Sequence, residues 1–261
     1  EIKAIFPAAK IGAGVNAYFA ELNRNRPYSA QVEFINFAVC PQVHAFDDVS
    51  LIENLEAQKH VVESAKNLFP EKQIFVSPVT LKQRFNVVAT SDEPEVETDT
   101  VPSQVDARQN SVFAAQWLLG SLKFLAQSGT DLVTYFETVG WRGFIQGDFE
   151  SPVPEIFDSK KGDIFPVFYL LNEIAGFNEV IYSESISPLE VDGIVIAGIN
   201  LNGQPVKKLI LANFSNQPKK VKVSGIETAP EGNNLFTSYQ IKKENGLFEI
   251  TENQIVTITV L

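Results

Sequence analysis

The stretch that decides the fold is "VEFINFAVCPQVHAFDDVSLIENLEAQKHVVESAKNLFPEKQIFVSPVTL", residues 32–81. Its two ends, 32–39 and 73–81, are short runs that are apolar on both faces, and they predict β-strands. Between them the apolar positions of residues 50–69 recur at helical spacing, which predicts an amphipathic helix. A strand, a helix and a second strand in this order are typical of a parallel sheet covered by helices.

The same alternation continues on both sides of this stretch. Apolar runs at 10–18 and 131–141 predict further strands. Helical patterns at 1–7, 111–129 and 165–177 predict further helices. The helix of the opening stretch can be capped by Asp48 or Ser50, and Gly129 is expected to end the helix at 111–129. An acidic run, "DEPEVETD" at 92–99, predicts a solvated loop. Residues 1–177 therefore supply four βα units.

The pattern changes near residue 178. From there to residue 261 the chain reads as short strands separated by turns, with Asn-Gly hairpin signals in "NLNGQ" and "ENGLF". This predicts an antiparallel β-sandwich at 178–261. A complete (β/α)₈ TIM barrel takes about 250 residues, so 1–177 is interpreted as the C-terminal half of such a barrel, its strands five to eight. The expected partner is the missing N-terminal half of the barrel, or another chain.

Composition narrows the functional classes. The formal net charge of −11 disfavours nucleic acid and anionic membranes as partners. No apolar run is long enough to span a bilayer, and the N-terminus lacks a signal pattern, so a cytoplasmic protein is expected. With one cysteine and two histidines, no disulfide and no histidine-rich metal site is expected. We expect no cofactor, since the sequence contains no P-loop, GxSxG, HExxH or full GxGxxG signature.

Active sites of βα folds lie at the C-terminal ends of the strands, so the residues that follow each strand are the candidates. The candidates for substrate binding are Asn16, Glu21, Arg24, Asp47, Arg84, Tyr135, Trp141 and Arg142. Arginine offers a rigid donor fork for carboxylate or polyol oxygens, although an ordinary ion pair is the preferred explanation for each arginine taken alone. Trp141 is a possible platform for a sugar ring.

Glu137 and His44 are the candidate catalytic residues. Glu137 ends an otherwise apolar strand beside aromatic side chains, surroundings that raise a carboxyl pKa and suit acid or base catalysis. The alternative is a buried glutamate paired with Arg142. His44 precedes Asp47 and Asp48, either of which can orient its ring as a general base or cap the following helix. The alternative for His44 is a loop histidine that bonds the backbone.

Several segments, taken in order, resemble one family. "NAYFAELNRNRP", "PQVHAFDDVSLIENLEAQ", "VSPVTLKQRFN", "QVDARQNSVFAAQW" and "VTYFETVGWRG" look like the D-apionate lactonase family of sugar-acid hydrolases. The resemblance implies a glycoside-hydrolase-like barrel with a C-terminal sandwich, and hydrolysis of a sugar-acid lactone in a bacterial pentose pathway. The half-barrel alone is expected to be inactive.

Two other functions remain open. The first is a retaining glycoside hydrolase of the large barrel clan, although the strand expected to carry its nucleophile, 73–81, ends without a carboxylate. The second is a non-catalytic carbohydrate-binding protein. That function needs exposed aromatic side chains on the sandwich, which has no tryptophan.

Overall fold

The computed structural model describes residues 2–27, 30–84, 86, 100–199 and 202–261. The acidic run at 92–99 lies outside the described residues. By its internal contacts the chain divides into two compact units. The first comprises residues 1–106 and 124–138, and the second comprises residues 107–123 and 139–261.

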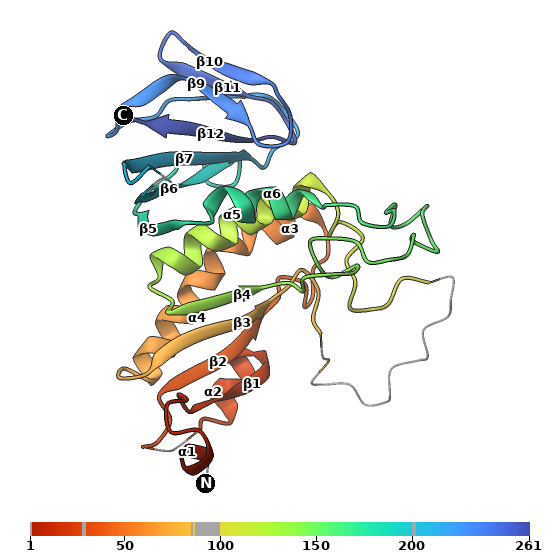
Figure 1. Ribbon diagram of the computed structural model, residues 1–261, viewed down its shortest axis with the longest axis vertical. Helices are drawn as coiled ribbons and strands as arrows, with labels where there is room; N and C mark the ends of the chain where they lie inside the picture. The colour runs from red at the N-terminus through yellow and green to blue at the C-terminus, as the bar shows by residue number, and fades with distance from the viewer. Residues whose placement is uncertain (1, 28–29, 85, 87–99, 200–201) are drawn as a thin grey trace. The chain divides into compact units, whose positions relative to one another are not determined.

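A four-stranded parallel sheet forms the centre of the first unit (Figure 1). Its strands lie side by side in chain order: β1 (Gly12–Tyr18), β2 (Phe34–Val39), β3 (Gln73–Val79) and β4 (Leu132–Tyr135). The helices that precede or connect them are α1 (Ile2–Ile5), α2 (Phe19–Arg24), α3 (Asp48–Glu53), α4 (Leu55–Leu68) and α5 (Val112–Gln127). Helix α5 begins in the second unit and its last turn belongs to the first. The predicted βα order is therefore confirmed.

The two faces of this sheet differ in burial. Alternate residues of β2 and β3 are at most 1% exposed, namely Ile35, Phe37, Ile74 and Val76. The residues between them are only half-buried, namely Phe34, Asn36, Phe75 and Ser77. Among the described residues the helices of this unit leave that second face incompletely covered, although the strands are apolar on both sides. In a closed barrel such a face points to the interior.

Aromatic rings stack on the half-buried face. The Phe34 and Phe75 ring centroids are 4.2 Å apart at an interplanar angle of 19°. A Cβ atom at Gly12 would lie 2.0 Å from the Phe34 ring, so any other residue there would force the ring to move. The glycine therefore fixes how closely the ring can lie on the neighbouring strand.

The predicted helix at 50–69 is two helices. Helix α3 ends at Glu53 and α4 starts at Leu55, with Asn54 between them. The N-cap of α3 is Asp47, whose side chain accepts from the Ser50 backbone N–H. Of the residues offered as cap from the sequence, Asp47 is the one observed, and the prediction of Asp48 or Ser50 is wrong. The structure places Asp48 in the first turn instead.

The end of α5 agrees with the prediction. Gly129 has a φ of +71°, its N–H donates to the Ala126 carbonyl, and the Thr130 N–H donates to the Leu125 carbonyl. These two bonds satisfy carbonyls that the helix end leaves free, which is the Schellman arrangement. Glycine is favoured there because a left-handed φ strains other residues.

An eight-stranded antiparallel sheet makes up most of the second unit, preceded by α6 (Pro166–Ile174). In spatial order its strands are β5 (Phe177–Ile181), β6 (Val191–Ile199), β7 (Pro205–Asn213), β12 (Ile255–Val260), β9 (Thr228–Asn234), β10 (Gln240–Glu244), β11 (Leu247–Ile250) and β8 (Lys219–Val221). The sheet curls on itself (Figure 1). Phe248 and Ile250 of β11 share a core with Leu211 and Val256. The predicted sandwich is confirmed.

The hairpin between β10 and β11 follows its sequence signal. Asn245 and Gly246 have φ values of +50° and +82°, as a type I′ turn requires. Strand β9 was not predicted, because "TAPEGNN" is composed largely of turn residues. It forms because β10 and β12 pair with it on both sides. No helix among the described residues is both long and apolar enough to cross a membrane.

Candidate active site

Polar side chains gather where the strands of the first unit end. A small cavity of about 10 Å³ lies there, and its wall includes Asn16, Tyr18, Cys40, Thr80 and Arg84. Asn16 and Tyr18 come from β1, Cys40 follows β2, and the other two follow β3. The C-terminal ends of β1, β2 and β3 therefore contribute to one place, as parallel pairing requires.

Glu137 forms an ion pair with Arg84, which lines this cavity. Arg84 Nη1 lies 3.4 Å from Glu137 Oε1, and the two side chains are 25% and 32% exposed. One ion pair of Glu137 is therefore with Arg84; the pair with Arg142 that the sequence suggested stays a prediction. Both side chains keep some exposed surface, although Arg84 Nε and Nη2 are themselves buried, so a ligand can reach only part of the pair.

The backbone around Phe136 sets the position of Glu137. Strand β4 ends at Tyr135, two residues earlier than Glu137. Phe136 then takes a φ of +56°, while its N–H donates to the Val79 carbonyl at 3.1 Å and its side chain is buried. A left-handed conformation costs a bulky residue about 1–2 kcal/mol, and such strained positions concentrate at functional sites.

Tyr18 and Cys40 were not predicted as site residues. The Tyr18 hydroxyl donates to Gln83, and burial, with a smaller contribution from Cys40, raises the pKa of Tyr18 to about 12. Burial likewise raises the pKa of the Cys40 thiol to about 12. Tyr18 is thus a protonated donor at neutral pH, and Cys40 is not a thiolate nucleophile. Their only sequence signal was their position at or just after a strand end.

The loop after β2 is held by a buried amide. Gln42 Nε2 donates to the Leu81 carbonyl at 2.7 Å and to Asp106 Oδ2 at 2.5 Å, and both side chains are buried. These bonds tie the segments that follow β2 and β3 to the segment before α5. These bonds therefore hold in place the start of the loop that carries His44.

His44 itself is exposed on this loop. Both carboxylate oxygens of Asp47 are engaged by Ser50, one by its backbone N–H at 2.9 Å and the other by its hydroxyl at 2.8 Å. These bonds lower the pKa of Asp47. Of the two roles considered for Asp47, the structure shows the helix cap. Within the described ranges, no hydrogen bond or ion pair joins His44 to Glu137.

Two other candidates pair with each other on α2. Arg24 forms an i,i+3 ion pair with Glu21, and the Arg24 side chain is 66% exposed. This is the ordinary ion pair that was the alternative reading of each arginine. Tyr135, at the end of β4, is half-buried with its ring centroid 6.0 Å from that of Phe136.

Trp141 and Arg142 belong to the second unit. The Trp141 ring stacks on Phe157 at 5.6 Å and an interplanar angle of 28°, and lies 6.4 Å from the Phe149 ring. Its indole N–H is buried, with no hydrogen-bond partner among the described residues. Packing against Phe157 therefore covers one face of the Trp141 ring.

In the part of the chain that the structure describes, no three His, Cys, Asp or Glu side chains group as metal ligands. What the first unit brings together is an acidic group, a guanidinium, a phenol and an amide: Glu137, Arg84, Tyr18 and Asn16. This set can bind a polyol or carboxyl compound and can move a proton.

Known proteins resemble both parts of the chain. A curated D-apionate lactonase from Brucella anthropi is 28% identical over 176 residues, which is 67% of this chain and 28% of that protein. The chain thus spans less than a third of that relative. An α-L-arabinofuranosidase from Thermotoga maritima aligns over 100% of this chain and 59% of its own, with 13% identity and a TM-score of 0.61.

A second structure agrees on the fold. A family 51 α-L-arabinofuranosidase from Bifidobacterium longum aligns over 100% of this chain and 60% of its own, with 11% identity and a TM-score of 0.55. At such low identity these structures support only the architecture, a TIM-barrel-type domain followed by a β-sandwich. The family described as D-apionate lactonase, TIM barrel domain, matches residues 1–179, and the chain belongs to that family.

Proposed function

We propose that the protein hydrolyses the lactone of a sugar acid in the cytoplasm, with Glu137 at the reacting carbonyl. The observation that carries the proposal is the accessible Arg84–Glu137 pair at the C-terminal ends of the parallel strands. The family and the name of the Brucella anthropi relative supply the substrate class. Active sites of barrel enzymes lie at this end of the strands.

The reaction needs three functions. A base removes a proton from water as its oxygen bonds to the lactone carbonyl carbon, and a donor stabilises the oxyanion that forms. The bond from that carbon to the ring oxygen then breaks, and the ring oxygen takes up a proton to become a hydroxyl. Glu137 or His44 is the proposed base, and Arg84 or Arg142 is the proposed donor to the oxyanion. The Tyr18 oxygen, whose proton is donated to Gln83, can accept a hydrogen bond from a substrate hydroxyl.

We also propose that this chain acts together with further βα units. The half-buried stack of Phe34 and Phe75 supports this, since a barrel interior is a packed core. By itself the chain is expected to turn over no lactone. Supplying the preceding half of the barrel, in the same polypeptide or as a separate chain, is expected to restore turnover.

Assays on two substrate classes test the proposal. The complete protein should open five-membered lactones of pentose and branched sugar acids and should leave aryl glycosides intact. Turnover of aryl arabinofuranosides without turnover of any lactone would replace the proposal with the glycoside hydrolase. That alternative lacks an Asp or Glu within β3 or in the described residues directly after it, where its nucleophile is expected.

A further inference from the structure

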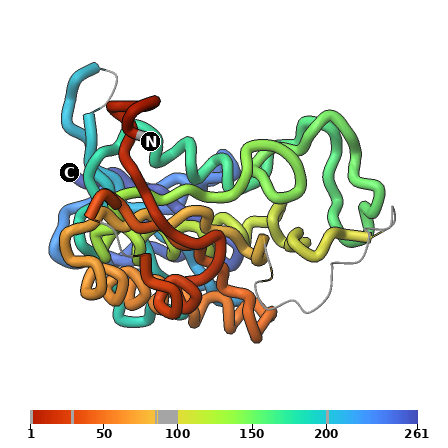
Figure 2. Tube along the Cα trace, turned by 90° about the horizontal axis from the view of Figure 1, so that it is seen from below, coloured from red at the N-terminus to blue at the C-terminus, as the bar shows by residue number. Residues whose placement is uncertain are grey.

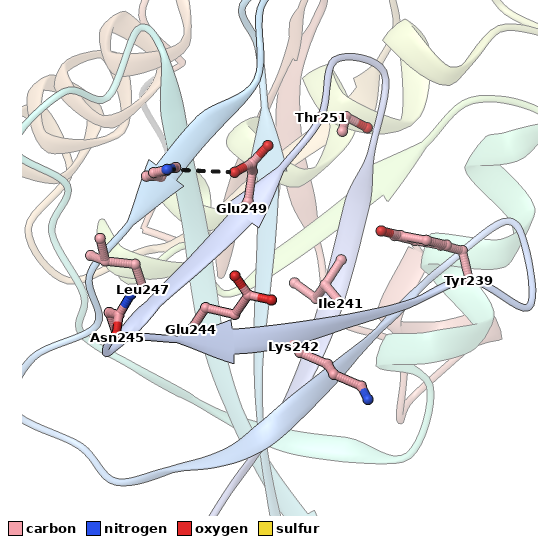
Figure 3. A pocket seen from close by; sticks show the side chains of 9 residues that line it. Tyr239, Ile241, Lys242, Glu244, Asn245, Leu247, Glu249 and Thr251 are labelled. Carbon is pink, nitrogen blue, oxygen red and sulfur yellow. Dashed lines mark ion pairs between the residues drawn. The ribbon is translucent and has the colours of Figure 1, made fainter.

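The outer surface of β10, β11 and β8 in the second unit contains an open groove of about 250 Å³ (Figure 3). This is close to the lower end, about 300 Å³, of the size range of small-molecule sites. By comparison, the cavity at the strand ends of the first unit is only about 10 Å³. The groove is lined by Lys220, Tyr239, Ile241, Lys242, Glu244, Asn245, Leu247, Glu249 and Thr251.

The lining combines an apolar floor with a polar rim. Ile241 is buried and Leu247 is half-buried. Tyr239, at one end of the groove, is 59% exposed. Figure 3 shows the Tyr239 hydroxyl and the Glu244 carboxylate extending toward Ile241. An apolar surface beside an aromatic ring and a few polar groups is the general form of a small-molecule site.

The polar groups of the rim have hydrogen-bonding capacity to spare. Among the described residues, the side chains of Tyr239, Lys242, Glu244 and Asn245 have no hydrogen-bond or ion-pair partner. Lys220 and Glu249 form a loose pair, 3.9 Å apart, with side chains 70% and 57% exposed. An exposed pair of this kind contributes little stability, so its atoms are available to a ligand at small cost.

The charges of the rim decide the kind of ligand. Two lysines and two glutamates alternate across the three strands, so the groove carries no net charge. Donors and acceptors are therefore both present, without a field that selects an anion or a cation. A neutral ligand with many hydroxyl groups and one apolar face fits this set, because hydroxyl groups both donate and accept and the C–H face covers tyrosine and leucine.

We propose that this groove binds a neutral saccharide of one or two sugar units, and that the sandwich thereby holds carbohydrate independently of catalysis. The proposal does not depend on lactone hydrolysis. All residues of the groove belong to the second unit, whereas Glu137 and Arg84 belong to the first. Failure of one proposal therefore leaves the other standing.

Titration of the ¹⁵N-labelled chain, residues 1–261, with xylobiose tests the site. Backbone amide shifts are expected at Tyr239, Lys242, Asn245 and Thr251, with a millimolar dissociation constant. Tyr239→Ala is expected to weaken binding by about tenfold, because the ring is the largest apolar surface on the rim. Glu244→Gln, which keeps side-chain size, is expected to weaken it less.

Tyr182→Ala is the matched control. Tyr182 is exposed to nearly the same degree, 61%, lies in the same unit outside the groove, and bonds Glu184. It is expected to bind xylobiose as the unsubstituted chain does. No shifts at these amides, equal weakening by Tyr182→Ala, or stronger binding of glucuronate than of xylobiose would each overturn the proposal. The amide spectrum of each variant, recorded before the titration, shows whether that variant is folded like the unsubstituted chain.

Discussion

Each compact unit contains a carboxylate paired with a cation, and the two pairs differ in their access to water. In the first unit Glu137 and Arg84 are 3.4 Å apart, with side chains 32% and 25% exposed. In the second unit Lys123 Nζ lies 2.5 Å from Asp192 Oδ1, with side chains 4% and 3% exposed. Helix α5 and strand β6 supply the buried pair.

The difference separates a structural pair from one that can react. Asp192 Oδ1 also accepts from the Gly193 N–H at 2.8 Å, so the buried carboxylate is held from two sides. Removing one member of a desolvated pair leaves an uncompensated charge, which is strongly destabilising. A half-exposed pair keeps contact with water and loses little when one member is replaced. Glu137 can therefore exchange partners during a reaction, and Asp192 cannot.

Removing one member of each pair gives the largest expected contrast. Lys123→Met should lower the free energy of unfolding by about 3–5 kcal/mol, because Asp192 stays buried without its counter-charge. Glu137→Gln should change it by no more than about 1 kcal/mol. Urea denaturation of the two variants measures both values. Equal losses would mean that burial does not distinguish the two pairs.

The pH dependence of stability should reveal the effect of burial on the Asp192 carboxyl. Burial raises the pKa of Asp192, and the opposing effects of Lys123 and the Gly193 N–H are smaller. A carboxyl whose pKa is higher in the folded state contributes stability that is full below its unfolded pKa, about 3.9, and is lost as pH rises through the folded pKa. Relative to Asp192→Asn, the unsubstituted chain should therefore lose stability as pH rises through that interval.

Asp47 provides a control of opposite sign. Its bonds to Ser50 lower its pKa, so its contribution is present above the unfolded pKa and is lost as pH falls through the folded value. Denaturation curves from pH 3 to 7 for Asp192→Asn and Asp47→Asn, each compared with the unsubstituted chain, should slope in opposite directions. Parallel slopes would contradict the assignment.

The smallest effect is expected at the exposed pair on α2. Glu21→Gln removes an i,i+3 partner of Arg24, whose side chain is 66% exposed. Such pairs contribute about 0.2–0.5 kcal/mol, and less at high salt. Thermal unfolding at low and high salt would detect the change. A loss as large as that of Lys123→Met would show that exposure is a poor guide in this chain.

Periodicity was sufficient to predict the architecture, because it depends on local patterns. Apolar runs located all four parallel strands, and Asn245-Gly246 located a hairpin. Strand β9 was missed because its residues favour turns and its pairing is provided by distant strands. The break at Asn54 was missed because the apolar spacing continues across it.

The candidate site was only partly visible in the sequence. Strand order placed Asn16, Arg84 and Glu137 at one end of the sheet, and the structure joins the last two as an ion pair. The sequence could not identify Tyr18 as a half-buried donor, because that depends on Gln83, 65 residues away. Nor could spacing decide between the two roles of Asp47, since a cap depends on the backbone conformation at Ser50.

The most direct measurement is lactone turnover by the complete protein carrying Glu137→Gln. The substitution keeps side-chain size and removes the charge, so turnover should fall by about 10²–10⁴-fold, the usual contribution of a positioned acid or base. Glu63→Gln, at an exposed carboxylate on α4 that pairs with Lys59 and His60, should leave turnover unchanged. Near-normal turnover in both Glu137→Gln and His44→Ala would contradict the proposed site.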